Sequence, residues 1–329
     1  MRANIDKTRI EAMDLVTESQ TAAVIGTGMM GPGIGLTLAM GGVRTTIVSR
    51  SAARAEEGVR KAARVGGQLV DEGLADAGEI SRALGLLSGS DQFEETIANS
   101  GLVIESAPED LAFKQELFAR LEAVAPRDAV LASNTSGLSI TAIAARCARP
   151  ERILTTHFWN PPHLVPLVEV VPAEKTDMHF AEAVRDLLAA CGKTPVVIRK
   201  DRPGMIGNRL QMALVREAAN IVAQGIADAD AVDAVVKHGL GIRMPEYGLL
   251  EHMDIVGLDL ALRVVEYVVP DLYNEPRAPE YMREMVRRGN LGAKTGHGFY
   301  DWSAKNAEAV KARRDRFLAE VLRFRKRSA

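Results

Sequence analysis

TAAVIGTGMMG, residues 21–31, is the stretch of sequence that decides the fold. Its apolar start, Ala22–Ile25, is typical of a buried β-strand, and a glycine-rich turn follows it directly. A helical pattern continues to Leu36–Met40, and a second strand is predicted at Thr45–Val48. The stretch therefore predicts the strand–turn–helix start of a βαβ unit that binds a dinucleotide.

The turn itself has the spacing Gly-x-Gly-x-x-Gly. The first glycine permits a tight turn, the second lets a pyrophosphate approach the backbone, and the third lets helix and strand pack closely. The N-terminus of the following helix then offers amide donors and partial positive charge to the phosphates. A glycine-rich turn without a ligand is the alternative, and the flanking strand and helix disfavour it. The predicted cofactor contacts in this loop are Gly26, Gly28, Met29, Met30 and Gly31.

Short apolar runs alternate with amphipathic helical patterns between Thr21 and about Lys200. Clear helical patterns are Ala112–Val124 and Ala181–Ala190. Such alternation predicts an α/β Rossmann-type domain, in which helices cover both faces of a mostly parallel sheet. The expected strands are Ala22–Ile25, Thr45–Val48, Leu102–Glu105, Ala129–Ala132, Ile153–Thr156, Leu167–Val171 and Pro195–Ile198.

The pattern changes after Asp201-Arg202-Pro203-Gly204, where helical segments follow one another without an intervening strand. We therefore expect a dinucleotide-binding Rossmann domain at residues 21–200 and an all-α C-terminal domain at residues 201–329. An N-terminal extension, residues 1–20, is expected to be a short helix or a loose tail. The helical segments expected in the C-terminal domain are Met205–Gln224, Asp228–Leu240, Asp259–Val269, Ala278–Arg288 and Lys305–Arg325.

The composition excludes several classes of partner. Of the 329 residues 41 are basic and 43 acidic, so the net charge of −2 creates no field that would hold nucleic acid or an anionic membrane. No run reaches the roughly 18 apolar residues that a membrane span needs. Cys147 and Cys191 lack a metal-binding or redox spacing, which predicts free thiols in a cytoplasmic protein, with one disulfide as the alternative. Apolar residues within the basic segment Arg313–Arg327 predict a surface helix with one packed face rather than a nucleic-acid arm.

The residues at the end of the second strand bear on the ribose of the cofactor. An NAD site usually has an acidic residue here, whereas this sequence has Ser49 and Arg50, with Arg54 close behind. A carboxylate would repel a 2′-phosphate, and a hydroxyl with guanidinium groups would bind it. We therefore expect NADP to be favoured over NAD. Solvated arginines with loose ribose specificity are the alternative.

A histidine and a glutamate are predicted to meet across two strands. His157 ends one strand, the proline-bearing turn Pro161–Pro166 follows, and Glu169 lies on the returning apolar strand Leu167–Val171. Histidine is the usual acid–base catalyst near neutral pH, and a neighbouring carboxylate orients its ring and stabilises the imidazolium. A charged Glu169 on such a strand would be costly without a partner. His157 and His163 lack further matching ligands, so no metal site is expected.

Six motifs follow one another along the chain: GTGMMG at residues 26–31, ESAPED at 105–110, SNTS at 133–136, HFWNP at 157–161, PGMIGNR at 203–209 and GAKTGHGFY at 292–300. In combination they resemble the 3-hydroxyacyl-CoA dehydrogenase family, and the resemblance covers nearly all of residues 21–302. It implies the same two-domain fold, with a C-terminal helical domain that serves the substrate and forms a homodimer.

The resemblance also implies roles for individual residues. It places the catalytic roles on His157, Glu169, Ser136 and Asn208. It places further dinucleotide contacts on Glu109, Lys114 and Lys294. His157 would be the general base or acid, Glu169 would orient it, and the other two catalytic residues would hydrogen-bond the substrate oxygen. The implied reaction is the reversible oxidation of a secondary alcohol β to a carboxylate or CoA thioester, with hydride transfer to the nicotinamide.

The segment Asn160–Glu169 is similar to the branch that contains L-gulonate 3-dehydrogenase and lambda-crystallin, whose members handle free hydroxy acids. Glu56–Asp76, where the family binds CoA phosphates, lacks a lysine-dense run. The substrate is therefore expected to be a small hydroxy acid, its CoA thioester, or another small hydroxy compound. Two other interpretations are a β-hydroxyacid dehydrogenase of the 6-phosphogluconate type, which uses a catalytic lysine, and a non-catalytic, crystallin-like nucleotide-binding protein. The His–Glu pair and the four filled catalytic positions disfavour both.

Overall fold

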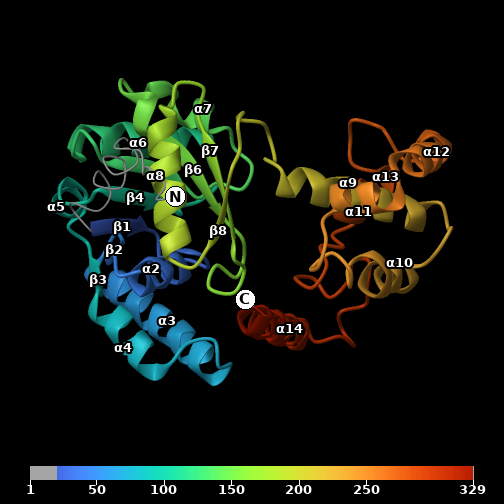
Figure 1. The fold of residues 1–329 in the computed structure, drawn as a ribbon, viewed down its shortest axis with the longest axis horizontal. Coiled ribbons are helices and arrows are strands. Elements are labelled where there is room, and N and C mark those ends of the chain that lie inside the picture. Colours follow the sequence, from blue (N-terminus) through green and yellow to red (C-terminus); the bar gives the residue numbers. More distant parts are fainter. Residues whose placement is uncertain (1–20, 329) are drawn as a thin grey trace, which may run out of the picture. The chain divides into compact units, whose positions relative to one another are not determined.

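The computed structural model describes residues 21–328, so the predicted N-terminal extension lies outside the described residues. The described chain forms two compact units (Figure 1). One comprises the residues up to Asn208 together with the segment from Arg313 onward, and the other comprises Arg209–Ala312. The first unit carries the sheet, and the second is helical.

One sheet forms the centre of the first unit. Its strand order is β3-β2-β1-β4-β5-β6-β7-β8, and every neighbouring pair is parallel except β6 and β7. The order reverses between β1 and β4, which creates the switch point at which such sheets bind their ligands. Within the described residues the strands are β1 (Thr21–Ile25), β2 (Arg44–Val48), β3 (Leu87–Ser90), β4 (Leu102–Glu105), β5 (Val130–Ser133), β6 (Ile153–Phe158), β7 (Leu167–Pro172) and β8 (Thr194–Val197). The predicted α/β Rossmann-type sheet is confirmed.

The predicted strands are confirmed with small shifts at their ends, and β3 is an additional strand. Its sequence, Leu87-Ser88-Gly89-Ser90, contains one apolar residue, and among the described strands it pairs only with β2. An edge strand with so little apolar surface has no pattern that sets it apart from a loop.

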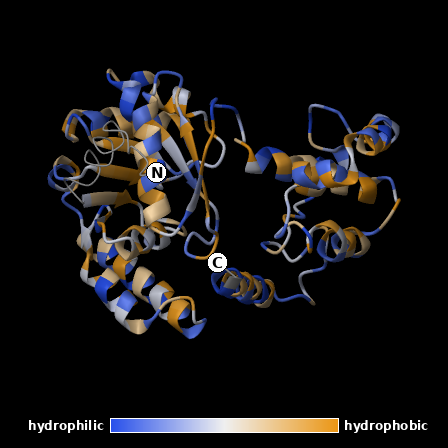
Figure 2. Ribbon diagram, in the orientation of Figure 1, coloured by the Kyte–Doolittle hydropathy of each residue, from blue (hydrophilic) through white to orange (hydrophobic). Residues whose placement is uncertain are grey.

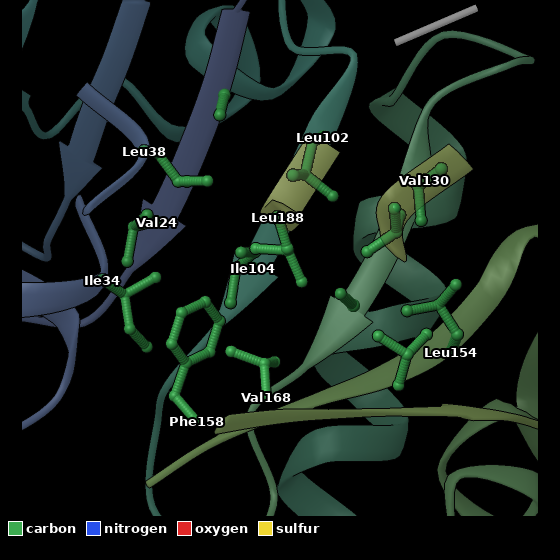
Figure 3. Packing of buried hydrophobic residues seen from close by; sticks show 14 of the residues in the cluster. Val24, Ile34, Leu38, Leu102, Ile104, Val130, Leu154, Phe158, Val168 and Leu188 are labelled. Atoms are coloured by element: carbon green, nitrogen blue, oxygen red, sulfur yellow. The ribbon is translucent and has the colours of Figure 1, made fainter. Parts of the chain in front are cut away.

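Helices cover both faces of the sheet because the central strands are buried along nearly their whole length and successive side chains point to opposite faces. On one face, Val24 of β1 and Ile104 of β4 pack with Ile34 of α2 and Leu188 of α8 (Figure 3). On the other face, α6 contributes the fully buried Phe118. The helices of this unit are α2 (Gly31–Met40), α3 (Ala52–Asp71), α4 (Ala77–Gly85), α5 (Phe93–Ala98), α6 (Leu111–Val124), α7 (Ile140–Ile143), the 3₁₀ turns η1 (Ala144–Arg146) and η2 (Pro150–Arg152), and α8 (Met178–Ala190).

From α9 onward the described chain is helical, and its only strand-like contacts are the isolated bridges that His297 makes with Gly292 and Asp301. The predicted helical segments are confirmed, and α11 is an additional helix. Apolar and polar residues are mixed along these helices (Figure 2). No helix within residues 21–328 is both long and apolar enough to cross a membrane. The helices are α9 (Gly207–Ala223), α10 (Ala229–Val235), the π-helical turn η3 (Val236–Leu240), α11 (Leu249–Val256), α12 (Leu258–Val268), η4 (Val269–Asp271), α13 (Glu280–Arg287) and α14 (Ala307–Ser328).

The C-terminal part of α14 packs on the first unit. Leu318 and Leu322 join the apolar cluster formed by α2, α3 and α4, and Ala319 is fully buried. Arg323 donates to the backbone oxygen of Glu72 at the end of α3. The predicted surface helix with one packed face is thus confirmed.

The glycine loop between β1 and α2 depends on two close approaches. Gly26 has a φ of 120°, a conformation that favours glycine, and a Cβ there would collide with the carbonyl oxygen of Ser106. A Cβ on Gly31 would overlap the carbonyl oxygen of Gly26. A Cβ on Gly28 would meet no atom of the described residues within 4 Å. Gly26 and Gly31 are therefore required by the loop itself, whereas Gly28 leaves an open surface.

These contacts predict different effects for two matched substitutions. Gly31→Ala should lower the free energy of unfolding by about 1–3 kcal/mol, because the new methyl group forces backbone apart in a packed region. Gly28→Ala should change it by less than about 0.5 kcal/mol, since the methyl group enters open space. Urea unfolding followed by circular dichroism measures both. Equal destabilisation by the two substitutions would contradict this account of the loop.

Candidate active site

The proposed catalytic residues gather where β5 and β6 end and β7 begins. The antiparallel pairing of β6 with β7 places His157 directly opposite Glu169. His157 Nδ1 and Glu169 Oε2 lie 2.8 Å apart, and the two residues are only 5% and 1% exposed. The predicted juxtaposition is therefore confirmed, and it follows from a strand, a short turn and a returning strand.

Glu169 is surrounded by hydrogen-bond donors. Its Oε1 accepts from the backbone N–H of Ile206 (3.0 Å) and of Gly207 (2.9 Å), at the start of α9. Its Oε2 is shared by the His157 ring and by Trp159, whose indole Nε1–H donates over 3.2 Å. Such a shell is what a buried carboxylate requires, because an unpaired buried charge is very costly.

These donors keep Glu169 ionised. Burial by itself would raise the pKa of Glu169, but the hydrogen bonds from His157, Gly207, Ile206 and Trp159 outweigh it and hold the pKa below its usual range. A carboxylate that accepts at Nδ1 requires a proton on that nitrogen. The assigned arrangement therefore directs the unprotonated Nε2 of His157 away from Glu169.

Ser136 and Asn208 are brought together as well. Asn208 Nδ2 donates to the backbone oxygen of Ser136 (2.7 Å). Ser136 is exposed, and its hydroxyl makes no hydrogen bond within the described part of the chain. Next to it, Asn134 Oδ1 accepts from the backbone N–H of Phe158 (2.9 Å), which ties the end of β5 to the end of β6. The Ser136 hydroxyl is thus a donor held on a supported loop close to the His157 strand.

A second buried carboxylate lies at the ends of β4 and β5. Glu105 is fully buried, and it accepts from Lys114 Nζ (2.6 Å) and from the Ser133 hydroxyl (2.6 Å). Lys114 is 1% exposed, and its Nζ also lies 3.5 Å from Glu109 Oε2. The ammonium group of Lys114 is therefore paired with two glutamates of its own chain. Its predicted contact with the dinucleotide stays a prediction.

Glu109 connects this ion pair with the Ser136 loop. Its Oε1 accepts from the Thr135 hydroxyl (2.5 Å) and from the backbone N–H groups of Ser136 and Gly137 (3.1 Å each). Burial would raise the pKa of Glu109, but the Thr135 hydroxyl, the charge of Lys114 and the two amides lower it overall. Because its side chain is 44% exposed, Glu109 can fix the loop and still face a ligand.

The glycine loop has the features that a pyrophosphate needs. Met30, which precedes α2, makes no side-chain cap, so the first amides of the helix are not consumed by a capping side chain. The surface at Gly28 is open, and Met29 beside it is 77% exposed. The residues present therefore fit a dinucleotide, which the predicted contacts Gly26, Gly28, Met29, Met30 and Gly31 would hold.

Ser49, Arg50 and Arg54 lie at the end of β2 and the start of α3. Both arginines are exposed, and neither makes an ion pair or hydrogen bond to another described side chain. A carboxylate is nearby, because Asp91 Oδ2 accepts from the first amide of α3, that of Ala52 (3.0 Å). The predicted ribose site thus contains two guanidinium groups without a side-chain partner among the described residues. Its one carboxylate, that of Asp91, already accepts a hydrogen bond from Ala52.

The remaining predicted residue, Lys294, is exposed in the second unit, between α13 and α14. Sequence reasoning missed the roles of Trp159, Glu105 and the Ile206 and Gly207 amides. The isolated acidic residue at the end of the apolar run Leu102–Glu105 is a signal that could have identified Glu105 as a buried, paired carboxylate.

Comparison with known proteins agrees with this geometry. A family model described as "3-hydroxyacyl-CoA dehydrogenase, NAD binding domain" matches residues 21–202, and one described as "3-hydroxyacyl-CoA dehydrogenase, C-terminal domain" matches residues 204–302. The chain is 33% identical to 5-formyl-3-hydroxy-2-methylpyridine 4-carboxylate 5-dehydrogenase of Mesorhizobium japonicum, over 92% of this chain and 97% of the relative. It is 35% identical to 3-hydroxybutyryl-CoA dehydrogenase of Mycobacterium tuberculosis, over 86% and 98%.

Solved structures are similar too. A crystal structure of a 5-formyl-3-hydroxy-2-methylpyridine 4-carboxylic acid 5-dehydrogenase, described as an NAD+-dependent dismutase, matches with a TM-score of 0.85 at 32% identity, over 93% of this chain and 98% of that one. (S)-3-hydroxybutyryl-CoA dehydrogenase from Ralstonia eutropha matches with a TM-score of 0.72 at 32% identity, over 86% and 99%.

The glycine loop at the switch point, the strand order and the matches over both parts of the chain agree with one another. The chain belongs to the 3-hydroxyacyl-CoA dehydrogenase family, and it is an NAD(P)-dependent dehydrogenase that acts on CH–OH groups.

Proposed function

We propose that the protein reversibly oxidises a secondary alcohol β to a carboxylate or CoA thioester, with His157 and Glu169 as its acid–base pair. The observation that carries the proposal is the buried contact of 2.8 Å between His157 Nδ1 and Glu169 Oε2. It leaves Nε2 as the basic atom of a ring that is oriented by an ionised carboxylate.

In the oxidation direction, His157 Nε2 takes the proton of the substrate hydroxyl. Glu169 stabilises the imidazolium that forms and keeps the ring from turning. The Ser136 hydroxyl and the Asn208 amide hydrogen-bond the substrate oxygen, and Glu109 holds the loop that carries Ser136. The nicotinamide, when bound, supplies the acceptor for the hydride. In the reverse direction His157 returns the proton.

The substrate that we favour is a small free hydroxy acid. On α3, where the resemblance to the family would place CoA phosphates, Arg64 and Arg60 both hydrogen-bond to Glu57 and lower its pKa to about 2. Lys61 of the same helix donates to the backbone oxygen of Thr27 (3.0 Å). These cations are therefore engaged within the chain. The Mesorhizobium relative is named for a carboxylate without CoA, while the mycobacterial relative is named for a CoA thioester.

The test of the reaction is a matched pair of histidine variants. His157→Gln should lower kcat/KM by roughly 100-fold or more, the size of a lost general base, and leave cofactor affinity unchanged. His179→Gln, in the first turn of α8, is the control and should keep wild-type activity. The assay uses a panel of free 3-hydroxy acids and 3-hydroxyacyl-CoA thioesters, so the same measurement identifies the substrate class. Activity retained in the His157 variant would refute the assignment.

NADP is the cofactor that we propose to be favoured over NAD. A 2′-phosphate beside Ser49 would face the guanidinium groups of Arg50 and Arg54, and two cations outweigh the single carboxylate of Asp91, which already accepts from Ala52. The absence of an acidic residue at position 49 removes the usual ribose ligand of an NAD site.

Removal of both guanidinium groups tests this preference. Arg50→Ser combined with Arg54→Ser should weaken NADP binding about 10-fold or more, because two charge-assisted contacts are lost. The affinity for NAD should change by less than about twofold, since no contact with a 2′-hydroxyl is removed. Calorimetric titration of each nucleotide gives both values. Wild-type binding that favours NAD tenfold would contradict the proposed preference.

We also propose that the protein forms a homodimer through its second unit. Several large apolar side chains of α11 and α12 are exposed, among them Leu250 (82%), Ile255 (71%) and Tyr267 (87%). Apolar patches of this kind mark protein interfaces.

We further propose that the protein works in the cytoplasm on small molecules, without nucleic acid or membrane. Cys147 and Cys191 are free thiols, which agrees with a reducing compartment.

The dimer predicts a particle of twice the 35.5 kDa mass of one chain. Leu250→Asp should shift this particle toward the monomer, because a charge would then have to be buried in the interface. Light scattering at micromolar concentration measures the mass. Ser81→Asp, an exposed neutral position on α4 of the first unit, controls for the added charge, and a wild-type monomer would refute the proposal.

A further inference from the structure

The indole N–H of Trp159 is engaged with the acid–base pair. Trp159 comes directly after β6, and its Nε1 donates over 3.2 Å to Glu169 Oε2. The same oxygen accepts from His157 Nδ1 at 2.8 Å. The two rings lie side by side, with centroids 5.6 Å apart and planes at 50°. Trp159 and His157 therefore both donate to one oxygen of Glu169.

The two oxygens of Glu169 are satisfied in different ways. Within residues 21–328, Oε1 accepts from backbone alone, namely the N–H groups of Ile206 and Gly207. Oε2 accepts from the side chains His157 and Trp159. A substitution of Trp159 therefore removes a donor from Oε2, the oxygen that contacts the His157 ring. The backbone hydrogen bonds to Oε1 stay in place.

The position of the indole is built into the fold. A Cβ on Gly207 would overlap the six-membered part of the Trp159 ring. The helical start of α9 thus brings its backbone against the ring, and the same residue donates its N–H to Glu169. The indole is half-buried and confined between this glycine and the strand pair.

Among the residues that the structure describes, His157 is the titratable group that hydrogen-bonds Glu169. His157 comes from β6, the register neighbour on β8 is the apolar Val196, and the start of α9 contributes backbone amides. The hydrogen bond from Trp159 is one of the groups that lower the pKa of Glu169. An acceptor that already holds a second donor attracts a further proton less strongly.

We propose that Trp159 is a positioning residue, whose N–H restrains Glu169 Oε2 and limits how strongly Glu169 stabilises protonated His157. The inference rests on the proposed role of His157 as the acid–base group. Acting through Glu169, Trp159 thereby lowers the pH at which His157 becomes available as a base.

Trp159→Phe tests this, because it keeps an aromatic ring and removes the N–H. Glu169 should then stabilise the imidazolium more strongly, so His157 should lose its proton at higher pH. The acid limb of the pH profile of kcat/KM for alcohol oxidation should move upward by about half a pH unit, the size of a modest hydrogen-bond effect. Cofactor affinity should stay unchanged. Trp302→Phe, the same substitution in the second unit, should leave the profile as in the wild type.

A second measurement does not depend on turnover. The NMR signal of the His157 ring, identified by its loss in His157→Gln, can be titrated with pH in both proteins. Its midpoint should rise in Trp159→Phe, and an unchanged midpoint would overturn the proposal. A midpoint that rises while the pH–rate profile stays fixed would support the role of Trp159 and refute His157 as the catalytic base. If Trp159→Phe does not fold, 3-benzothienylalanine at position 159 keeps the bicyclic shape and lacks the N–H.

Discussion

The negative charge of Glu169, almost excluded from water, is the constraint on which the active site depends. A buried carboxylate is tolerated only when its oxygens are fully hydrogen-bonded. The chain meets this demand with donors from β6, from the residue after β6 and from the first residues of α9. One side chain on β7 therefore fixes the orientation of the His157 ring, the packing of Trp159 and the point at which α9 begins.

Glu105 is a second buried carboxylate whose hydrogen bonds connect neighbouring elements, at the ends of β4 and β5. It lies at the end of β4, binds Lys114 of α6 and the Ser133 hydroxyl of β5, and is fully buried. Through Lys114 it reaches Glu109, and through Glu109 the amides of the Ser136 loop. The two buried carboxylates thus hold the two loops between which the proposed chemistry takes place. These hydrogen bonds form a polar network at the strand ends, while the glycine loop at Gly28 is open to a dinucleotide.

The sequence predicts much of this architecture because the decisive features are local. Apolar runs that alternate with helical patterns reveal the strands of the sheet, and the glycine spacing reveals the turn after β1. A short proline-bearing connection is enough to bring His157 opposite Glu169. The edge strand β3 escapes prediction because its residues carry almost no apolar signal and only its pairing with β2 defines it. The burial of Lys114 depends on how α6 packs, and the Trp159 hydrogen bond depends on the close approach of Gly207. Neither is encoded in a spacing along the chain.

The most direct measurement of the central claim is the tautomer of His157 in the protein at neutral pH. Nitrogen-15 NMR of the labelled histidine rings distinguishes a protonated Nδ1 from a protonated Nε2, and His157→Gln identifies the signal. The account predicts that Nδ1 carries the proton, since Glu169 Oε2 accepts from it at 2.8 Å, and that Nε2 is unprotonated and able to act as a base. A ring protonated at Nε2 alone would contradict it.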